Sequence, residues 1–102
     1  MMRTHLCGVL TEANIGQQVA VTGWVNRRRE HGEHLAFVDL RDHSGIVQCV
    51  VDNTVDVRSE YVLRITGTVT ERPEGTINDA LATGRVEITD AEVEILLSLI
   101  HI

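Results

Sequence analysis

The sequence predicts a single all-β domain. Apolar and polar residues alternate with a period of two through most of the chain, which is typical of strands buried on one face. Glycine and other turn-forming residues separate the alternating runs. The 102 residues, of which 43% are hydrophobic and 24% are charged, match the size and composition of one globular domain. This composition excludes a disordered or collagen-like chain.

Five alternating runs are expected to form strands, and the last of them is expected to bend. They cover residues 19–25, 35–40, 45–51, 62–69 and 85–95, with a break in the last run between residues 89 and 92. Residues 55–60 leave room for about one helical turn between the third and fourth strands.

The connections predict how these strands are arranged. Residues 42–45, Asp-His-Ser-Gly, are typical of a tight turn, whereas residues 29–34 and 72–84 are expected to form longer connections. Three strands in a meander, a short helical turn and two further strands are the order of an OB-fold, a five-stranded Greek-key barrel. Gly23 and Gly67, each inside a run, suit the sharp coiling of a small barrel. On the pattern alone, a five-stranded sandwich of another topology remains open.

The two ends of the chain lead to expectations about location and domain boundaries. The sequence has no apolar run of roughly 18 residues that would span a bilayer and no secretory signal, so we expect a cytoplasmic protein. Residues 97–102 break the alternation and resemble the translation of a transposase sequencing adapter. We therefore expect the domain to cover residues 1–96 and the last six residues to be a non-native tail.

Charge is unevenly distributed along the chain. The formal net charge is −6; residues 1–50 carry five arginines and five acids, and residues 51–102 carry four arginines and ten acids. A phosphate-binding surface is therefore expected to be local and to lie in the first half. All nine cationic residues are arginine, whose planar group binds phosphates and base edges and stacks on rings. A GC-rich genome that favours arginine codons explains the same bias.

The sequence contains no arrangement typical of catalysis or of a metal site. A paired nucleophile and base, a glycine-rich phosphate loop and convergent carboxylates are all absent, so we expect no enzymatic activity from these residues alone. Cys7 and Cys49 form no CxxC motif, which favours two buried thiols over a disulfide or a zinc site. His31, His34 and His43 fall in predicted loops, where exposed side chains are a better interpretation than metal ligands.

An aromatic ring, an amide and a run of arginines are the most informative side chains. Alternation places Phe37 with Asp39 on one face of their strand, opposite Ala36, Val38 and Leu40. A ring on the outside of an OB barrel is a stacking platform for an unpaired base, although periodicity alone is equally compatible with a core residue. Gln48 is either an amide that reads a base edge or a solvated strand residue. The run at 27–29 either binds nucleic acid or forms a solvated turn.

Six short strings carry a family resemblance when they are taken in order. They are Met-Arg-Thr-His at 2–5 with Cys-Gly at 7–8, Gly-Gln-Gln-Val at 16–19, Gly-Trp-Val-Asn-Arg-Arg-Arg at 23–29, Phe-Val-Asp-Leu-Arg-Asp at 37–42, Gly-Ile-Val-Gln at 45–48 and Ala-Thr-Gly at 82–84. Their order and spacing over about residues 2–93 resemble the N-terminal anticodon-binding domain of bacterial aspartyl-tRNA synthetases. This resemblance implies an OB-fold that binds the anticodon loop of tRNA-Asp.

The resemblance also implies roles for single residues. Phe37 would stack on the middle anticodon base, and Gln48 would bond to the edge of that base. Arg29 would contact anticodon bases, while Arg27 would support the loop and its phosphates.

Further implied positions follow the fourth strand. Arg72 and Glu87 would bracket the first anticodon base, where a carboxylate can accept hydrogen bonds from the N1 and N2 donors of guanine. Thr76 stands where the family commonly has Asn, so Thr76 and the nearby Asn78 are uncertain members of this set. The stretch 52–60 is shorter than the usual helix between the third and fourth strands.

The resemblance carries expectations about the parent enzyme. Its class II catalytic domain, which uses ATP and magnesium to attach aspartate to tRNA, is absent from this sequence, and the family is dimeric. His31 and Gly75 resemble the members that also charge tRNA-Asn, which suggests a role in tRNA discrimination.

Other functions of an OB-fold remain open at this stage. A free-standing protein that binds single-stranded nucleic acid would be expected to expose more than one aromatic ring. A protein-interaction module would leave the arginines beside Phe37 unexplained. Lysyl- and asparaginyl-tRNA synthetases share the architecture, but the opening residues 2–7 and the string at 37–42 favour aspartate.

Overall fold

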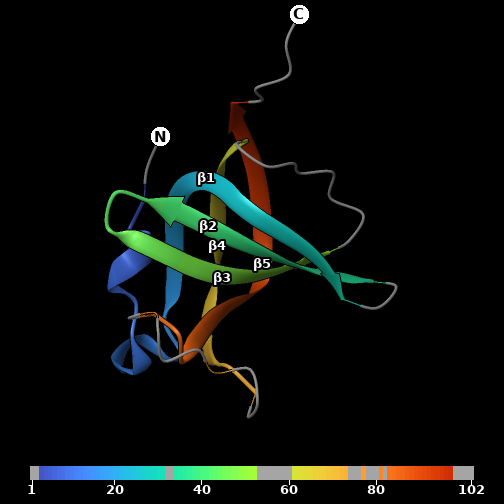
Figure 1. Cartoon of the computed structure of the whole chain (residues 1–102). Coiled ribbons are helices and arrows are strands. Elements are labelled where there is room, and N and C mark those ends of the chain that lie inside the picture. Colours follow the sequence, from blue (N-terminus) through green and yellow to red (C-terminus); the bar gives the residue numbers. More distant parts are fainter. Residues whose placement is uncertain are drawn as a thin grey trace, which may run out of the picture.

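The protein forms a closed barrel in which the strands follow each other in the order β1-β2-β3-β5-β4 (Figure 1). This computed structural model describes residues 3–31, 34–52, 61–73, 77, 81 and 83–97. The strands are β1 (Gln18–His31), β2 (Leu35–Asp42), β3 (Gly45–Asp52), β4 (Val62–Glu71) and β5 (Val86–Leu97). Two single 3-10 turns, η1 (Cys7–Val9) and η2 (Glu12–Asn14), precede them.

Strand pairing confirms the predicted OB-type barrel. β1 pairs antiparallel with β2 and with β4, β2 pairs with β3, and β4 pairs with β5. A parallel pairing of β3 with β5 closes the barrel. The closed strand order excludes the alternative, a five-stranded sandwich of another topology. The predicted helical turn at 55–60 lies outside the described residues.

The interior follows the alternation of the sequence. Ala36, Val38 and Leu40 of β2 are fully buried, and their neighbours in the strand point outward. The same rule on the other strands assembles a core of valine, leucine and isoleucine that includes both cysteines. Burial and the adjacent Asp42 carboxylate raise the pKa of the Cys7 thiol, and burial raises that of Cys49, so neither is an activated nucleophile. The prediction of two buried free thiols is confirmed.

β5 is one continuous strand with a bend, where the sequence showed a broken run. Its pairing with β4 shifts register between Thr66 and Thr68, and Asp90 takes a positive φ of 52° at the bend. Gly67 lies opposite this bend. A Cβ at Gly67 would come within 2.6 Å of both the Ile88 side chain and the Thr89 carbonyl oxygen. The bend therefore requires a glycine at this position, as expected for a tightly coiled barrel.

β1 is longer than the sequence predicted. Residues 29–31 were expected in a connection, but they continue the ladder, with Arg29 opposite Phe37 and His31 opposite Leu35. The end of this hairpin projects to the right of the barrel in Figure 1. Residues 29–31 are all polar or charged, so this end of the strand shows no apolar alternation although its partner strand does. That is why the pattern missed it.

The turn between β2 and β3 is held by a buried carboxylate. Asp42 accepts hydrogen bonds from the backbone amides of Ser44 and Cys7, both at 2.8 Å, and is 7% exposed. The Ser44 hydroxyl bonds to the same carboxylate. Although burial raises the pKa of Asp42, these hydrogen bonds outweigh it and lower the pKa below its usual value. Asp42 thus ties η1 to the predicted tight turn, where Gly45 has a φ of 147°.

Replacing Asp42 by Asn should destabilise the domain in a pH-dependent way. At neutral pH we expect a loss of about 1–3 kcal/mol in the free energy of unfolding, because a charged acceptor of several buried hydrogen bonds is lost. A carboxyl with a lowered pKa stabilises the fold above its unfolded pKa of about 3.9, and that contribution disappears as the pH falls through the folded pKa.

Urea unfolding of wild type and Asp42→Asn between pH 7 and pH 3 measures this difference. It should shrink below about pH 4, by the linkage just described. Glu92→Gln, which removes a charge from an exposed position on β5, is the matched control and should follow wild type. Equal stability of Asp42→Asn and wild type at pH 7 would contradict the role given to this carboxylate.

Candidate nucleic-acid interface

Four neighbouring strands bring their outward side chains together on one side of the barrel. Arg29 of β1 lies opposite Phe37 of β2, and Asp39 of β2 lies opposite Gln48 of β3. The parallel pairing then places Gln48 opposite Glu87 of β5. We call this set the reading face, and it comprises Arg27, Arg29, Phe37, Asp39, Gln48 and Glu87.

A chain of hydrogen bonds runs across the reading face. Arg29 Nη2 donates to Asp39 Oδ1 at 3.2 Å and to Gln48 Oε1 at 3.0 Å. Gln48 Nε2 donates to Glu87 Oε1 at 2.9 Å. The amide therefore has one orientation, with its carbonyl toward the guanidinium and its amino group toward the carboxylate. Such a network holds polar groups ready for a ligand before it arrives.

Phe37 lies on the outside of the barrel. Its ring is partly exposed, and the guanidinium carbon of Arg29 lies 5.7 Å from the ring centroid. This distance is within the range of a cation–π contact. The prediction that Phe37 shares a face with Asp39, opposite the apolar set, is confirmed, and the interpretation of Phe37 as a core residue is wrong.

Gln48 and Glu87 are polar groups held in buried positions. Gln48 is 4% exposed and Glu87 is 7% exposed, so the reading of Gln48 as a solvated strand residue is wrong. Buried amides and carboxylates are costly unless hydrogen-bonded, and the bond between these two side chains meets that need. They form the floor of the reading face.

Arg72 lies next to this floor. It is 6% exposed, and its Nε donates to the backbone carbonyl of Val86 at 3.0 Å. Burial lowers the pKa of Arg72, and the nearby carboxylates of Asp39 and Glu87 act in the opposite direction. The structure therefore brings Arg72 close to Glu87, as the family resemblance implies.

The arginine run divides between two faces. Arg27 lies opposite Asp39 in the strand register, and its side chain is exposed on the side of the reading face. Arg28 pairs with Val38, whose side chain points into the barrel, and it forms an ion pair of 3.5 Å with Glu30. The interpretation of the run as a solvated turn is wrong, because all three arginines belong to β1.

Other predicted site residues cannot be placed. Gly75, Thr76 and Asn78 lie outside the described residues. His31 ends β1, and its side chain is not described. The sequence reasoning did not single out Asp39, although its place two residues from Phe37 on the same face was the signal that could have found it.

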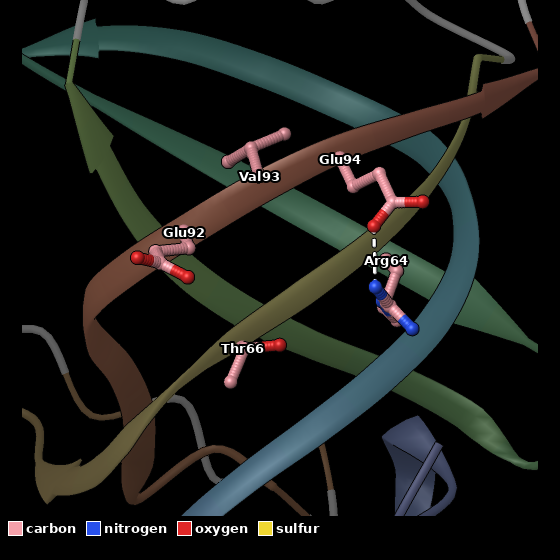
Figure 2. A pocket seen from close by; sticks show the side chains of 5 residues that line it. All are labelled: Arg64, Thr66, Glu92, Val93 and Glu94. Carbon is pink, nitrogen blue, oxygen red and sulfur yellow. Dashed lines mark hydrogen bonds and ion pairs between the residues drawn. The ribbon is translucent and has the colours of Figure 1, made fainter. Parts of the chain in front are cut away.

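The part of the chain that the structure describes contains no group of three metal-ligating side chains and no helix that could cross a membrane. A groove between β4 and β5 is shown in Figure 2, and its lining consists of Arg64, Thr66, Glu92, Val93 and Glu94. Arg64 is paired with Glu94, so the carboxylate of Glu92 has no cationic partner within this groove. Such a surface is unsuited to a phosphate backbone.

Comparison with known proteins agrees with this geometry. Residues 19–98 match the tRNA anticodon family, described as an OB-fold nucleic acid binding domain. An aspartate-tRNA(Asp/Asn) ligase of Bradyrhizobium diazoefficiens is 50% identical over 101 residues, covering 92% of this chain and 17% of the ligase. A ligase of the same name from Corynebacterium glutamicum is 53% identical over 103 residues, covering 94% of this chain and 17% of the ligase.

Solved structures show the same fold at lower identity. Asparaginyl-tRNA synthetase from Pyrococcus horikoshii superposes with a TM-score of 0.74 at 22% identity, over 97% of this chain and 24% of that protein. The OBody AM2EP06, solved bound to hen egg-white lysozyme, has a TM-score of 0.75 at 24% identity, with 96% of each chain covered. The chain thus spans about a sixth of the ligases it matches, and it belongs to the tRNA anticodon family of OB-fold nucleic acid binding domains.

Proposed function

We propose that this domain recognises the anticodon loop of tRNA-Asp as part of a longer aspartate-tRNA ligase. The observation that carries the proposal is the hydrogen-bonded chain from Arg29 through Gln48 to Glu87, beside the partly exposed ring of Phe37. Unpaired RNA bases are recognised by stacking on rings and by hydrogen bonds to their edges. The names of the similar ligases support tRNA as the ligand.

In this proposal, the middle anticodon base stacks on Phe37 and meets Gln48 at its edge. One proton of the Gln48 amino group is used by Glu87, and one lone pair of its carbonyl is used by Arg29. A side-chain amide has two N–H donors and two acceptor lone pairs, so one donor and one acceptor remain for a base. Arg29 fixes the amide and adds positive charge next to the ring. Arg27, exposed on the same side, is suited to the phosphates of the loop.

The first anticodon base is assigned to Glu87 and Arg72. One oxygen of the Glu87 carboxylate accepts from Gln48, and a carboxylate has further acceptor capacity for the N1 and N2 donors of guanine. Arg72 keeps positive charge beside this carboxylate. We assign Thr76 and Asn78 to anticodon binding on the resemblance alone.

The acidic net charge of −6 is compatible with this mode of binding. Nucleic-acid affinity that rests on phosphate contacts requires many cations. Stacking and edge recognition of a few splayed bases need only local positive charge. Arg27 and Arg29 supply such charge on the reading face.

Phe37→Ala should weaken binding of a tRNA-Asp anticodon stem-loop by about 1–3 kcal/mol, the value of one base stacked on an aromatic ring. Fluorescence anisotropy with labelled stem-loop measures the dissociation constant. Urea unfolding should show that the variant remains folded, because the ring is outside the core. Ile95→Ala, which removes an exposed apolar side chain near the other end of β5, is the control. Equal affinity of Phe37→Ala and wild type would remove the stacking role.

Glu87→Gln should relax selection at the first anticodon base. An amide in place of the carboxylate retains a partner for Gln48 but presents an amino group where guanine also has donors. Wild type should prefer guanine over inosine, which lacks the N2 amino group, by about 1–3 kcal/mol, and the variant should lose this preference. Competition between stem-loops with guanine or inosine at that position measures the ratio. An unchanged ratio in the variant would argue against the assignment of Glu87.

The longer protein is proposed to charge tRNA-Asn as well as tRNA-Asp. The similar ligases carry both tRNAs in their names, and His31 and Gly75 resemble members with this dual specificity. Aminoacylation by the full-length protein should therefore proceed with either tRNA as substrate. The two rates should lie within about tenfold of each other, which corresponds to a difference of roughly 1.4 kcal/mol or less in activation free energy. Rejection of tRNA-Asn would defeat this part of the proposal and leave anticodon binding untouched.

Further properties belong to that longer ligase. We propose that it is a cytoplasmic homodimer whose catalytic part uses ATP and magnesium, and no residue of this chain is assigned to either.

The alternative of a free-standing single-stranded nucleic-acid-binding protein predicts equal affinity for unrelated RNA loops. Competition of the tRNA-Asp stem-loop with one of scrambled anticodon distinguishes the two.

A further inference from the structure

The outward row of side chains continues past the reading face toward the other end of β1 and β2. β1 shifts register between Val25 and Arg27, so that Asn26 is an extra residue in the strand. A bulge of this kind changes the side to which the following side chains point. Trp24 lies opposite Arg41. Because of the extra residue, Trp24 is on the same outer side as Arg27 and Asp39.

Trp24 and Arg41 are both open to solvent. Trp24 is 40% exposed, a high value for the largest side chain, and Arg41 is exposed next to it. The backbone in this region is tightly packed, because a Cβ at Gly23 would come within 2.3 Å of the Arg41 carbonyl oxygen. The two side chains are therefore presented on a rigid part of the barrel and not on a loop.

The two arginines beside Trp24 differ from most described arginines of the barrel because they have no side-chain partner. Neither Arg27 nor Arg41 forms an ion pair or hydrogen bond with any side chain in the described part of the chain, whereas Arg29 is paired with Asp39. Arg64 on β4 is paired with Glu94 (Figure 2). In a chain of net charge −6, two guanidinium groups with no side-chain partner among the described residues thus flank an exposed indole.

We propose that Trp24 and Arg41 form a second RNA-contact site, which binds the sugar-phosphate backbone of the strand that leads away from the bases on the reading face. This inference rests on the proposed function. A guanidinium binds a phosphate with two parallel hydrogen bonds, and an indole packs against the ribose or a base beside it. The chemistry thus matches one nucleotide of RNA backbone.

The distance along β2 separates this site from the anticodon-base site. Arg41 lies four residues beyond Phe37, which corresponds to about 14 Å in an antiparallel strand. One base cannot contact both residues. The site therefore adds a backbone contact to a different nucleotide, and it should contribute affinity without base selectivity.

Two RNA probes separate this contact from base recognition. One is the complete tRNA-Asp anticodon stem-loop, and the other is the seven-nucleotide single-stranded loop alone. Trp24 is the only tryptophan of the chain, so its intrinsic fluorescence reports directly on this site. The stem-loop should change the emission of Trp24, whereas the short loop should bind with little change in emission.

Arg41→Gln is the decisive variant. It should weaken binding of the stem-loop by about tenfold and reduce the salt dependence of log K by about one, as expected for one lost phosphate contact. Its affinity for the short loop should remain unchanged. Arg64→Gln removes the same charge from a position paired with Glu94 and should bind both RNAs like wild type. Thermal unfolding of both variants should match wild type, because both side chains lie outside the core.

The outcomes distinguish this inference from the proposed function. If Arg41→Gln binds the stem-loop like wild type, or if Trp24 emission does not respond to it, the second site is wrong, even when Phe37→Ala still weakens binding. If wild type does not bind the stem-loop, or if Phe37→Ala and Arg41→Gln both bind normally, the proposed function fails as well. An equal effect of Arg41→Gln and Arg64→Gln would show a general effect of net charge and would also overturn the site.

Discussion

The parallel pairing of β3 with β5 is the constraint on which both the fold and the reading face depend. Its register sets Gln48 opposite Glu87 and Cys49 opposite Ile88. Cys49 and Ile88 point inward and close the core, while Gln48 and Glu87 point outward and bond to each other. One pairing therefore completes the hydrophobic interior and assembles the floor of the candidate site. A shift of one residue would exchange the two faces and lose both at once.

The buried polar groups in the floor and next to it make the site rigid. Gln48, Glu87 and Arg72 are each less than a tenth exposed, and each has a hydrogen-bond partner. Unpaired groups at such positions would cost stability, so the network restricts the side chains to one arrangement. A base that meets this surface finds its donors and acceptors already oriented. The energy of ordering them is provided by folding and not by binding.

Backbone irregularities decide which side chains share the outer surface. The extra residue Asn26 brings Trp24 to the same side as Arg27, and the bend at Asp90 lets β5 cross β4 where Gly67 has no side chain. Both features lie on strands whose regular alternation forms the core. The barrel thus keeps a hydrophobic core while small departures from regularity arrange its exterior.

The sequence by itself determined the five alternating runs, the inner and outer faces of each strand, and the family resemblance. From the alternation, the face that Phe37 shares with Asp39 could be predicted, because a period of two is a local property of a strand. The family resemblance implied that this face is the outside of the barrel, and the lack of a CxxC motif favoured two buried thiols. Only the tertiary structure decided that Gln48 meets Glu87, 39 residues away, and that Arg29 bonds to both Asp39 and Gln48. It also decided the full length of β1 and the bulge before Arg27. The physical reason is that strand register and closure depend on hydrogen bonds and packing between distant segments, which leave no periodic trace in either segment alone.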